Sequence, residues 1–148
     1  PLSYHGGSVW THDTAIAIMG LSKAGFLDEA GELIEGLLAA ASAFRYRMPE
    51  LHSGEAAMVT SRPIPYPAAC RPQAWSAAAA ISVVASVLGL SADAQGGTLT
   101  SSAAGLDTRL SVGGFQDGGF HDGGIQVDGI QFAGGTYRVD RSGVTKHQ

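Results

Sequence analysis

Side chains that could bind a sugar and move a proton gather in two stretches of the sequence. The first stretch, YHGGSVWTHD at residues 4–13, contains Tyr4, His5, Trp10, His12 and Asp13. The second stretch joins MPELHSG at 48–54 to PYPAACRPQAW at 65–75, and it contains Glu50, Tyr66, Gln73 and Trp75. Aromatic rings stack on the C–H faces of sugars, while carboxylate, imidazole and amide groups hydrogen-bond the hydroxyls. These residue types together favour a carbohydrate site.

Three helices are expected to position these stretches. Asp13 is expected to cap a helix that ends near Gly25 and is apolar on all sides, which predicts burial. A second helix is expected from Leu27 to Phe44, because apolar residues recur at three- and four-residue steps and acids take the other face. Pro72 is expected to open a third, Ala-rich and buried helix over 73–90.

The order buried helix, amphipathic helix, loop, buried helix predicts inner and outer helices of an (α/α)6 toroid. The fold class predicted for residues 1–92 is therefore mainly α, a part of such a toroid with about three helices. The remaining helices are expected upstream of Pro1. The proline-rich loop 48–72 and the stretch 4–13 are expected to project from the same end.

Residues 93–148 are predicted to form a short β-rich, Gly-rich tail, since 11 of the 21 glycines lie after residue 104. Short strands are expected at 98–100, 108–112, 125–127, 130–132 and 136–139. A five-residue repeat begins at 113, and residues 113–124 are interpreted as an inserted Gly-rich hairpin. A calcium site using Asp117, Asp122 and Asp128 is the alternative. No metal or cofactor is assigned.

Charge and composition exclude several functions. The net charge of −4 argues against nucleic acid as a partner. No apolar run reaches the roughly 18–20 residues that span a bilayer, so no membrane is expected as a partner. The single cysteine, Cys70, cannot form an intrachain disulfide and fits a cytoplasmic location.

The three motifs, in this order and spacing, resemble the C-terminal part of the glucosidase domain of glycogen debranching enzymes, the bacterial amylo-alpha-1,6-glucosidases. The resemblance covers residues 3–91, and VDGIQFAGGTYRVD at 127–140 resembles the β-rich end of that family. The sequence departs from the family pattern at Gly6, Thr11 and Thr14, where the family has Asn, Pro and Asn.

The resemblance implies an (α/α)6 barrel and inverting hydrolysis of alpha-1,6-linked glucose at branch points of glycogen or a related alpha-glucan, without a cofactor. Glu50 matches the family's general base, and the general acid is expected upstream of this chain, so the isolated chain is expected to be inactive. The remaining site residues are expected to bind substrate: Trp10, His12, Asp13, Tyr66, Gln73 and Trp75.

Other interpretations stay open at this point. The chain could be a non-catalytic carbohydrate-binding fragment, a trehalase-like or glucosylglycerate-type hydrolase, or a degenerate product whose tail replaced native sequence. Single residues also have structural alternatives: Glu50 as a loop acid paired with Arg47, Asp13 as a helix cap alone, and Gln73 as a partner of backbone groups. Trp10 and Trp75 could belong to the core, and Tyr66 and Cys70 could only shape the loop.

Overall fold

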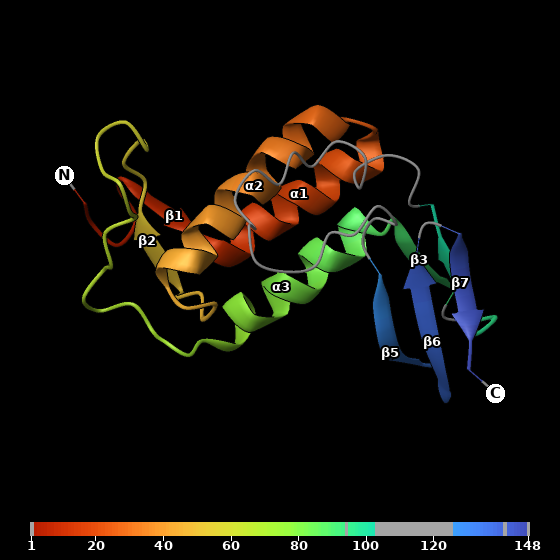
Figure 1. Ribbon diagram of the computed structural model, residues 1–148. Coiled ribbons are helices and arrows are strands. Elements are labelled where there is room, and N and C mark those ends of the chain that lie inside the picture. Colours follow the sequence, from red (N-terminus) through yellow and green to blue (C-terminus); the bar gives the residue numbers. More distant parts are fainter. Residues whose placement is uncertain (1, 94, 103–125, 141, 148) are drawn as a thin grey trace.

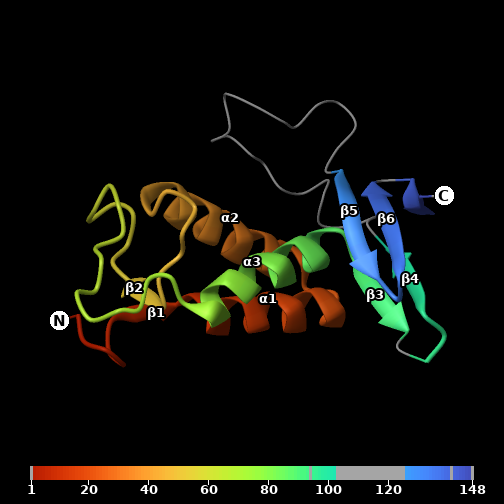
Figure 2. The ribbon, with the colours of Figure 1, turned by 90° about the horizontal axis from the view of Figure 1, so that it is seen from below.

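Three helices lie side by side in the middle of the molecule, with small sheets at both ends (Figures 1 and 2). The computed structural model describes residues 2–93, 95–102, 126–140 and 142–147. The helices are α1 (Thr11–Ala24), α2 (Leu27–Ala43) and α3 (Ala74–Val87). α1 packs against both α2 and α3, and the buried core lies between the three helices.

All the described strands pair antiparallel, in three separate sheets. At one end of the helices, β1 (Ser8–Trp10) pairs with β2 (Leu51–Ser53). At the other end, β3 (Leu90–Asp93) pairs with β4 (Thr98–Ser101). Beside them lies the three-stranded sheet of β5 (Val127–Phe132), β6 (Gly135–Asp140) and β7 (Gly143–Lys146).

The predicted fold class is wrong. The part of the chain that the structure describes is a small mixed α/β arrangement, with three helices and three antiparallel sheets, and not a mainly α part of a toroid. Two physical reasons explain the error. The strands β1, β2, β3 and β7 have only three or four residues each, too few for an alternating pattern to predict them. Helices that are apolar on all sides, such as α1 and α3, also leave apolar side chains exposed.

The three predicted helices are confirmed, with corrections at their bounds: α3 ends at Val87 and not at Leu90, which opens β3. α1 begins at Thr11, so Asp13 lies in its first turn and is not its cap. Gly25 ends α1 as predicted, in the left-handed conformation that glycine adopts without strain. α3 begins one residue later than predicted, because Gln73 is its N-cap and the Gln73 side chain accepts a hydrogen bond from the Ser76 N–H at 3.0 Å.

The core uses one face of each helix. Its fully buried members include Ile18 of α1 and Ile34 of α2, with Val87 of α3 packed against them. The amphipathic pattern predicted for α2 is confirmed, since its acids are exposed and its apolar face is buried. The predicted burial of α1 and α3 on most sides is wrong: Ile16 is 59% exposed and Ile81 is 73% exposed.

The described tail agrees with three of the predicted strands. The strand expected at 98–100 is β4, the strand expected at 136–139 lies in β6, and 130–132 lies in β5. The strand expected at 108–112, the insertion at 113–124, and Asp117 and Asp122 fall outside the described residues. Asp128 lies in β5, where its carboxylate is 3.6 Å from His147 Nε2 and 4.0 Å from Arg138 Nε.

Candidate functional site

The backbone around Glu50 is held by both α1 and α3. After α2 ends, Arg45 and Tyr46 adopt left-handed conformations that turn the chain back towards the helix starts. The Pro49 carbonyl then accepts hydrogen bonds from the buried hydroxyls of Thr11 and Ser76, each at 2.8 Å. Because Thr11 opens α1 and Ser76 lies in the first turn of α3, these bonds fix the position of Glu50 relative to both helices.

Two further backbone bonds fix Glu50 itself. The Thr11 N–H donates to the Glu50 carbonyl at 3.2 Å, and the Glu50 N–H donates to the Cys70 carbonyl at 3.0 Å. The proline-rich loop predicted over 48–72 is thus irregular along most of its length, with β2 as its short paired segment. Its closing part, around Cys70, packs back on Glu50.

Both oxygens of the Glu50 carboxylate accept a hydrogen bond. The Tyr4 hydroxyl donates to Oε1 at 2.7 Å, and the Cys70 N–H donates to Oε2 at 3.3 Å. The hydrogen bond to Glu50, together with burial and the negative charge of that carboxylate, raises the pKa of Tyr4 to about 12. Tyr4 therefore remains protonated and donates its proton to Glu50 across the neutral pH range. The alternative pairing of Glu50 with Arg47 is not among the described ion pairs.

Six ring side chains contact one another in a series that starts at Tyr4. We call them the aromatic cluster: Tyr4, His5, Trp10, His12, Tyr66 and Trp75. The Tyr4 ring lies 4.8 Å from the Trp10 ring and 5.9 Å from the Tyr66 ring. The His12 ring stands edge-on to Trp75 at 4.6 Å. The cluster therefore links Glu50 to the start of α3 through continuous ring contacts.

Parts of the cluster are open to solvent. Trp75 is 61% exposed, and His5, which stacks parallel on Trp10, is exposed as well. His12 lies deeper: its Nε2 is 3.3 Å from the Asp13 carboxylate, and its Nδ1 is buried without a hydrogen-bond partner among the described residues. A planar ligand face could stack on an exposed ring while its polar groups reach His12 or Glu50.

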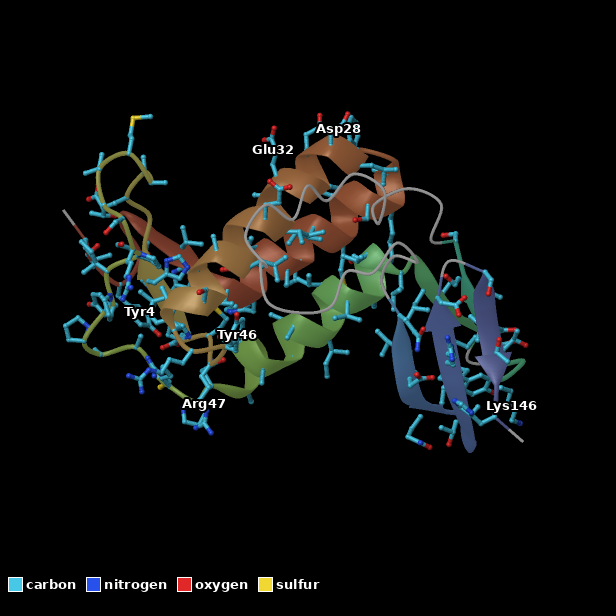
Figure 3. All side chains as sticks on the ribbon, in the orientation of Figure 1. Tyr4, Asp28, Glu32, Tyr46, Arg47 and Lys146 are labelled. Atoms are coloured by element: carbon cyan, nitrogen blue, oxygen red, sulfur yellow. The ribbon has the colours of Figure 1, made fainter. Side chains whose placement is uncertain are left out.

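The structure brings six of the predicted site residues to one end of the helices: Glu50, Trp10, His12, Asp13, Tyr66 and Trp75. Figure 3 labels Tyr4 at this end, where Tyr46 and Arg47 also lie, with Lys146 at the far end of the molecule. Gln73 lies at the same end, where its side-chain oxygen caps α3. That bond is the structural role considered for Gln73, and its role in substrate binding stays a prediction.

The contacts that fix Glu50 were not predicted. Tyr4 belongs to the first motif, but its pairing with Glu50 spans 46 residues and leaves no signal in spacing. The hydroxyls of Thr11 and Ser76 were missed for the same reason. At position 11, where the resembling family has proline, this chain supplies both an N–H and a hydroxyl to the Glu50 segment.

No group of three or more histidine, cysteine, aspartate or glutamate side chains in the described residues could hold a metal ion. Among the helices of the described ranges, none combines the length and apolar character needed to cross a bilayer. No protein-family model and no curated protein sequence matches this chain.

Proposed function

We propose that this chain supplies the general base and part of the sugar-binding surface of an inverting glycoside hydrolase. The proposed reaction releases alpha-1,6-linked glucose from branch points of glycogen or a related alpha-glucan, without a cofactor. The observation that supports it is the Glu50 carboxylate, fixed by the Tyr4 hydroxyl at 2.7 Å beside the aromatic cluster. We place the protein in the cytoplasm, where such a glucan would be stored.

The chemistry of a general base fits the surroundings of Glu50. A carboxylate oxygen accepts more than one hydrogen bond, so Oε1 and Oε2 each retain capacity for a water after bonding Tyr4 and Cys70. Glu50 is half-buried, which lets a water reach it while the protein fixes its orientation. Removing a proton from an attacking water at such a group contributes roughly 10²–10⁴ in rate.

The aromatic cluster fits the binding of a glucose unit next to that base. The exposed Trp75 ring offers a face for the C–H side of a pyranose, and the Asp13 carboxylate beside His12 could accept from hydroxyls. We assign Trp10, His12, Asp13, Tyr66, Gln73 and Trp75 to substrate contacts in this proposal.

Inverting hydrolysis also needs a general acid about 6.5–9.5 Å from the base, with a water between the base and the sugar. As the family resemblance implies, we propose that this acid comes from outside these 148 residues. The acid protonates the departing glucan oxygen, while water loses its proton to Glu50 and bonds to the anomeric carbon from the opposite face.

A second candidate is carbohydrate binding without hydrolysis. One observation favours it: both Glu50 oxygens already accept hydrogen bonds from the protein, as a purely structural carboxylate would. The two candidates differ in what happens to a bound glucan, since only the hydrolase releases glucose.

The test compares Glu50→Gln with wild type in the native protein that contains this chain, using a branched limit dextrin and measuring released glucose. We expect Glu50→Gln to lower kcat at least about a hundredfold, because an amide cannot accept the proton. The matched control is Glu55→Gln, an exposed glutamate on the following loop, which should keep wild-type turnover. Near-normal turnover in Glu50→Gln removes Glu50 from the role, and binding without any release of glucose supports the second candidate.

A further inference from the structure

A pocket of about 640 Å³ lies on the other side of the β1–β2 ribbon from Trp10. It is open to solvent and is lined by the C-terminal half of α2, the ribbon and the loop after β2. Val9 and His52 are register partners and both line the pocket, so their side chains share one face of the ribbon. Trp10 follows Val9 and therefore points to the opposite face. No residue of the aromatic cluster lines this pocket.

His52 lines the pocket and carries a hydrogen-bond acceptor that no described residue uses. Its side chain is only 6% exposed and packs against the Phe44 ring at 5.5 Å. Its Nδ1 lies 2.8 Å from the Ser53 carbonyl, which can only accept, so the imidazole proton is on Nδ1. Nε2 is buried and has no hydrogen-bond partner within the described part of the chain.

The protonation state of His52 sets what the ligand must offer. Burial lowers the pKa of His52 below its usual value, so the imidazole is neutral at neutral pH and Nε2 carries a lone pair. A group that fills this position must therefore donate a hydrogen, as an alcohol hydroxyl does. A bare anion has no hydrogen to donate, so the Nε2 lone pair would repel it.

Two arginines line the same pocket. The lining contains Arg45, Arg62 and one acid, Glu55, so the net formal charge of the lining is +1. Both arginines are exposed, and neither forms an ion pair with the described residues. Guanidinium groups bind phosphate through paired hydrogen bonds and keep their charge at all relevant pH values.

We propose that this pocket binds a small hydroxylated anion, a hexose phosphate by chemical class. One sugar hydroxyl donates to His52 Nε2, and the phosphate group is bound by Arg45 and Arg62. The hydroxyls of Thr60 and Ser61 line the same pocket and offer further hydrogen bonds to the sugar. The site is separate from Glu50 and does not depend on the hydrolase proposed above.

The test is calorimetric titration of the 148-residue chain with three probes: glucose 6-phosphate, glucose and inorganic phosphate. We expect glucose 6-phosphate to bind at least about tenfold more tightly than either of the others, because it alone satisfies both His52 and the arginines. Equal affinity for all three probes, or no binding of glucose 6-phosphate, overturns the proposal.

Variants locate the binding. Arg45→Gln and Arg62→Gln should each weaken glucose 6-phosphate binding about tenfold. Arg47→Gln, an exposed arginine outside the lining, should not change it. His52→Phe should weaken the binding of glucose 6-phosphate and leave the binding of inorganic phosphate unchanged.

The ¹⁵N resonance of His52 Nε2 in the wild type should also shift when glucose 6-phosphate binds, which tests the contact without a substitution. An unmoved resonance, or an Arg62→Gln effect no larger than that of Arg47→Gln, contradicts the site.

Discussion

The carboxylate of Glu50 and the hydroxyl of Tyr4 form the pair on which the candidate site depends. The resemblance of the MPELHSG motif to the glucosidase family singled out Glu50, whereas the residues alone also allowed an ordinary loop acid. Its partner could not be predicted, since Tyr4 is 46 residues away and the two meet only in the folded chain. The same holds for the Cys70 N–H, a backbone group that no side-chain pattern reveals.

The ionisation of Tyr4 tests this pair directly. In the wild type, the Tyr4 ring carbon bonded to oxygen should titrate by ¹³C NMR with a pKa of about 12. In Glu50→Gln, the pKa should fall towards the ordinary tyrosine value of about 10, because a neutral amide holds the phenol proton less strongly.

The sign of the effect on stability follows from that shift. A raised tyrosine pKa favours the neutral phenol in the folded protein. The stabilisation from this group is therefore complete below the unfolded-chain pKa, about 10. It is lost as the pH rises through about 12. Glu55→Gln serves as the control and should leave the Tyr4 titration unchanged. The same Tyr4 pKa in Glu50→Gln and wild type would disprove the pairing.

At the scale of elements, the Pro49 carbonyl joins the starts of α1 and α3. Thr11 and Ser76, both 2% exposed, donate to the same oxygen. Thr11→Val or Ser76→Ala alone should reduce the free energy of unfolding by about 1 kcal/mol, because the carbonyl keeps one donor. The double variant should lower the free energy of unfolding by more than the sum of the two single losses, because the buried Pro49 carbonyl then has neither hydroxyl as a donor.

Urea unfolding of the four proteins in this double-mutant cycle provides the measurement. Ser82→Ala, a change on the same helix at a hydroxyl that is not bonded to Pro49, should alter stability by less than about 0.5 kcal/mol. Strict additivity of the Thr11 and Ser76 variants would show that the two hydroxyls do not share the carbonyl.

Strand β2 carries a pH-dependent contribution to stability through His52. Because burial lowers the pKa of His52 in the folded protein, the unfolded chain takes up a proton first as the pH falls below about 6.5. The free energy of unfolding of wild type, measured against His52→Phe at each pH, should therefore be constant above about 6.5 and decline below it. A difference that grows on acidification would contradict the buried neutral imidazole.

The helices could be predicted from the sequence, whereas the shortest strands could not. The apolar steps of α2 and the glycine after α1 predict helices that the structure confirms. β1 and β2 are three residues each, too short for alternation to be read, and their pairing arises from contacts between distant segments. The cap assigned to Asp13 was wrong because the extended residue before the helix is Trp10, so α1 already begins at Thr11.

At the scale of the whole molecule, the candidate site and the β-rich tail lie at opposite ends of the helices (Figures 1 and 2). The toroid prediction was wrong because a helix that is apolar on every side need not be buried on every side. In the structure, α1 and α3 each leave an apolar face exposed, through Ile16 and Ile81. The sequence pattern shows which faces are apolar, but only packing decides which of them are covered.

The distribution of tryptophan makes sugar binding measurable on the intact chain. The chain has two tryptophans, Trp10 and Trp75, and both belong to the aromatic cluster. Maltooligosaccharides should therefore change the intrinsic fluorescence of the 148-residue chain, while no glucose is released. Trp75→Ala should weaken binding at least about tenfold, since stacked aromatic faces dominate such sites. Ile81→Ala, an exposed change on the same helix, should bind as wild type does, and loss of binding in that control would argue against the cluster as the site.

The most direct measurement is azide rescue of Glu50→Ala in the native protein, with a substrate carrying alpha-1,6-linked glucose. Azide attacks the anomeric carbon without giving up a proton, so it needs no general base. We predict that Glu50→Ala loses at least about a hundredfold in turnover and that azide restores cleavage, with glucosyl azide of the inverted β configuration as product. Normal turnover of Glu50→Ala, or no azide product from it, would contradict the role of Glu50.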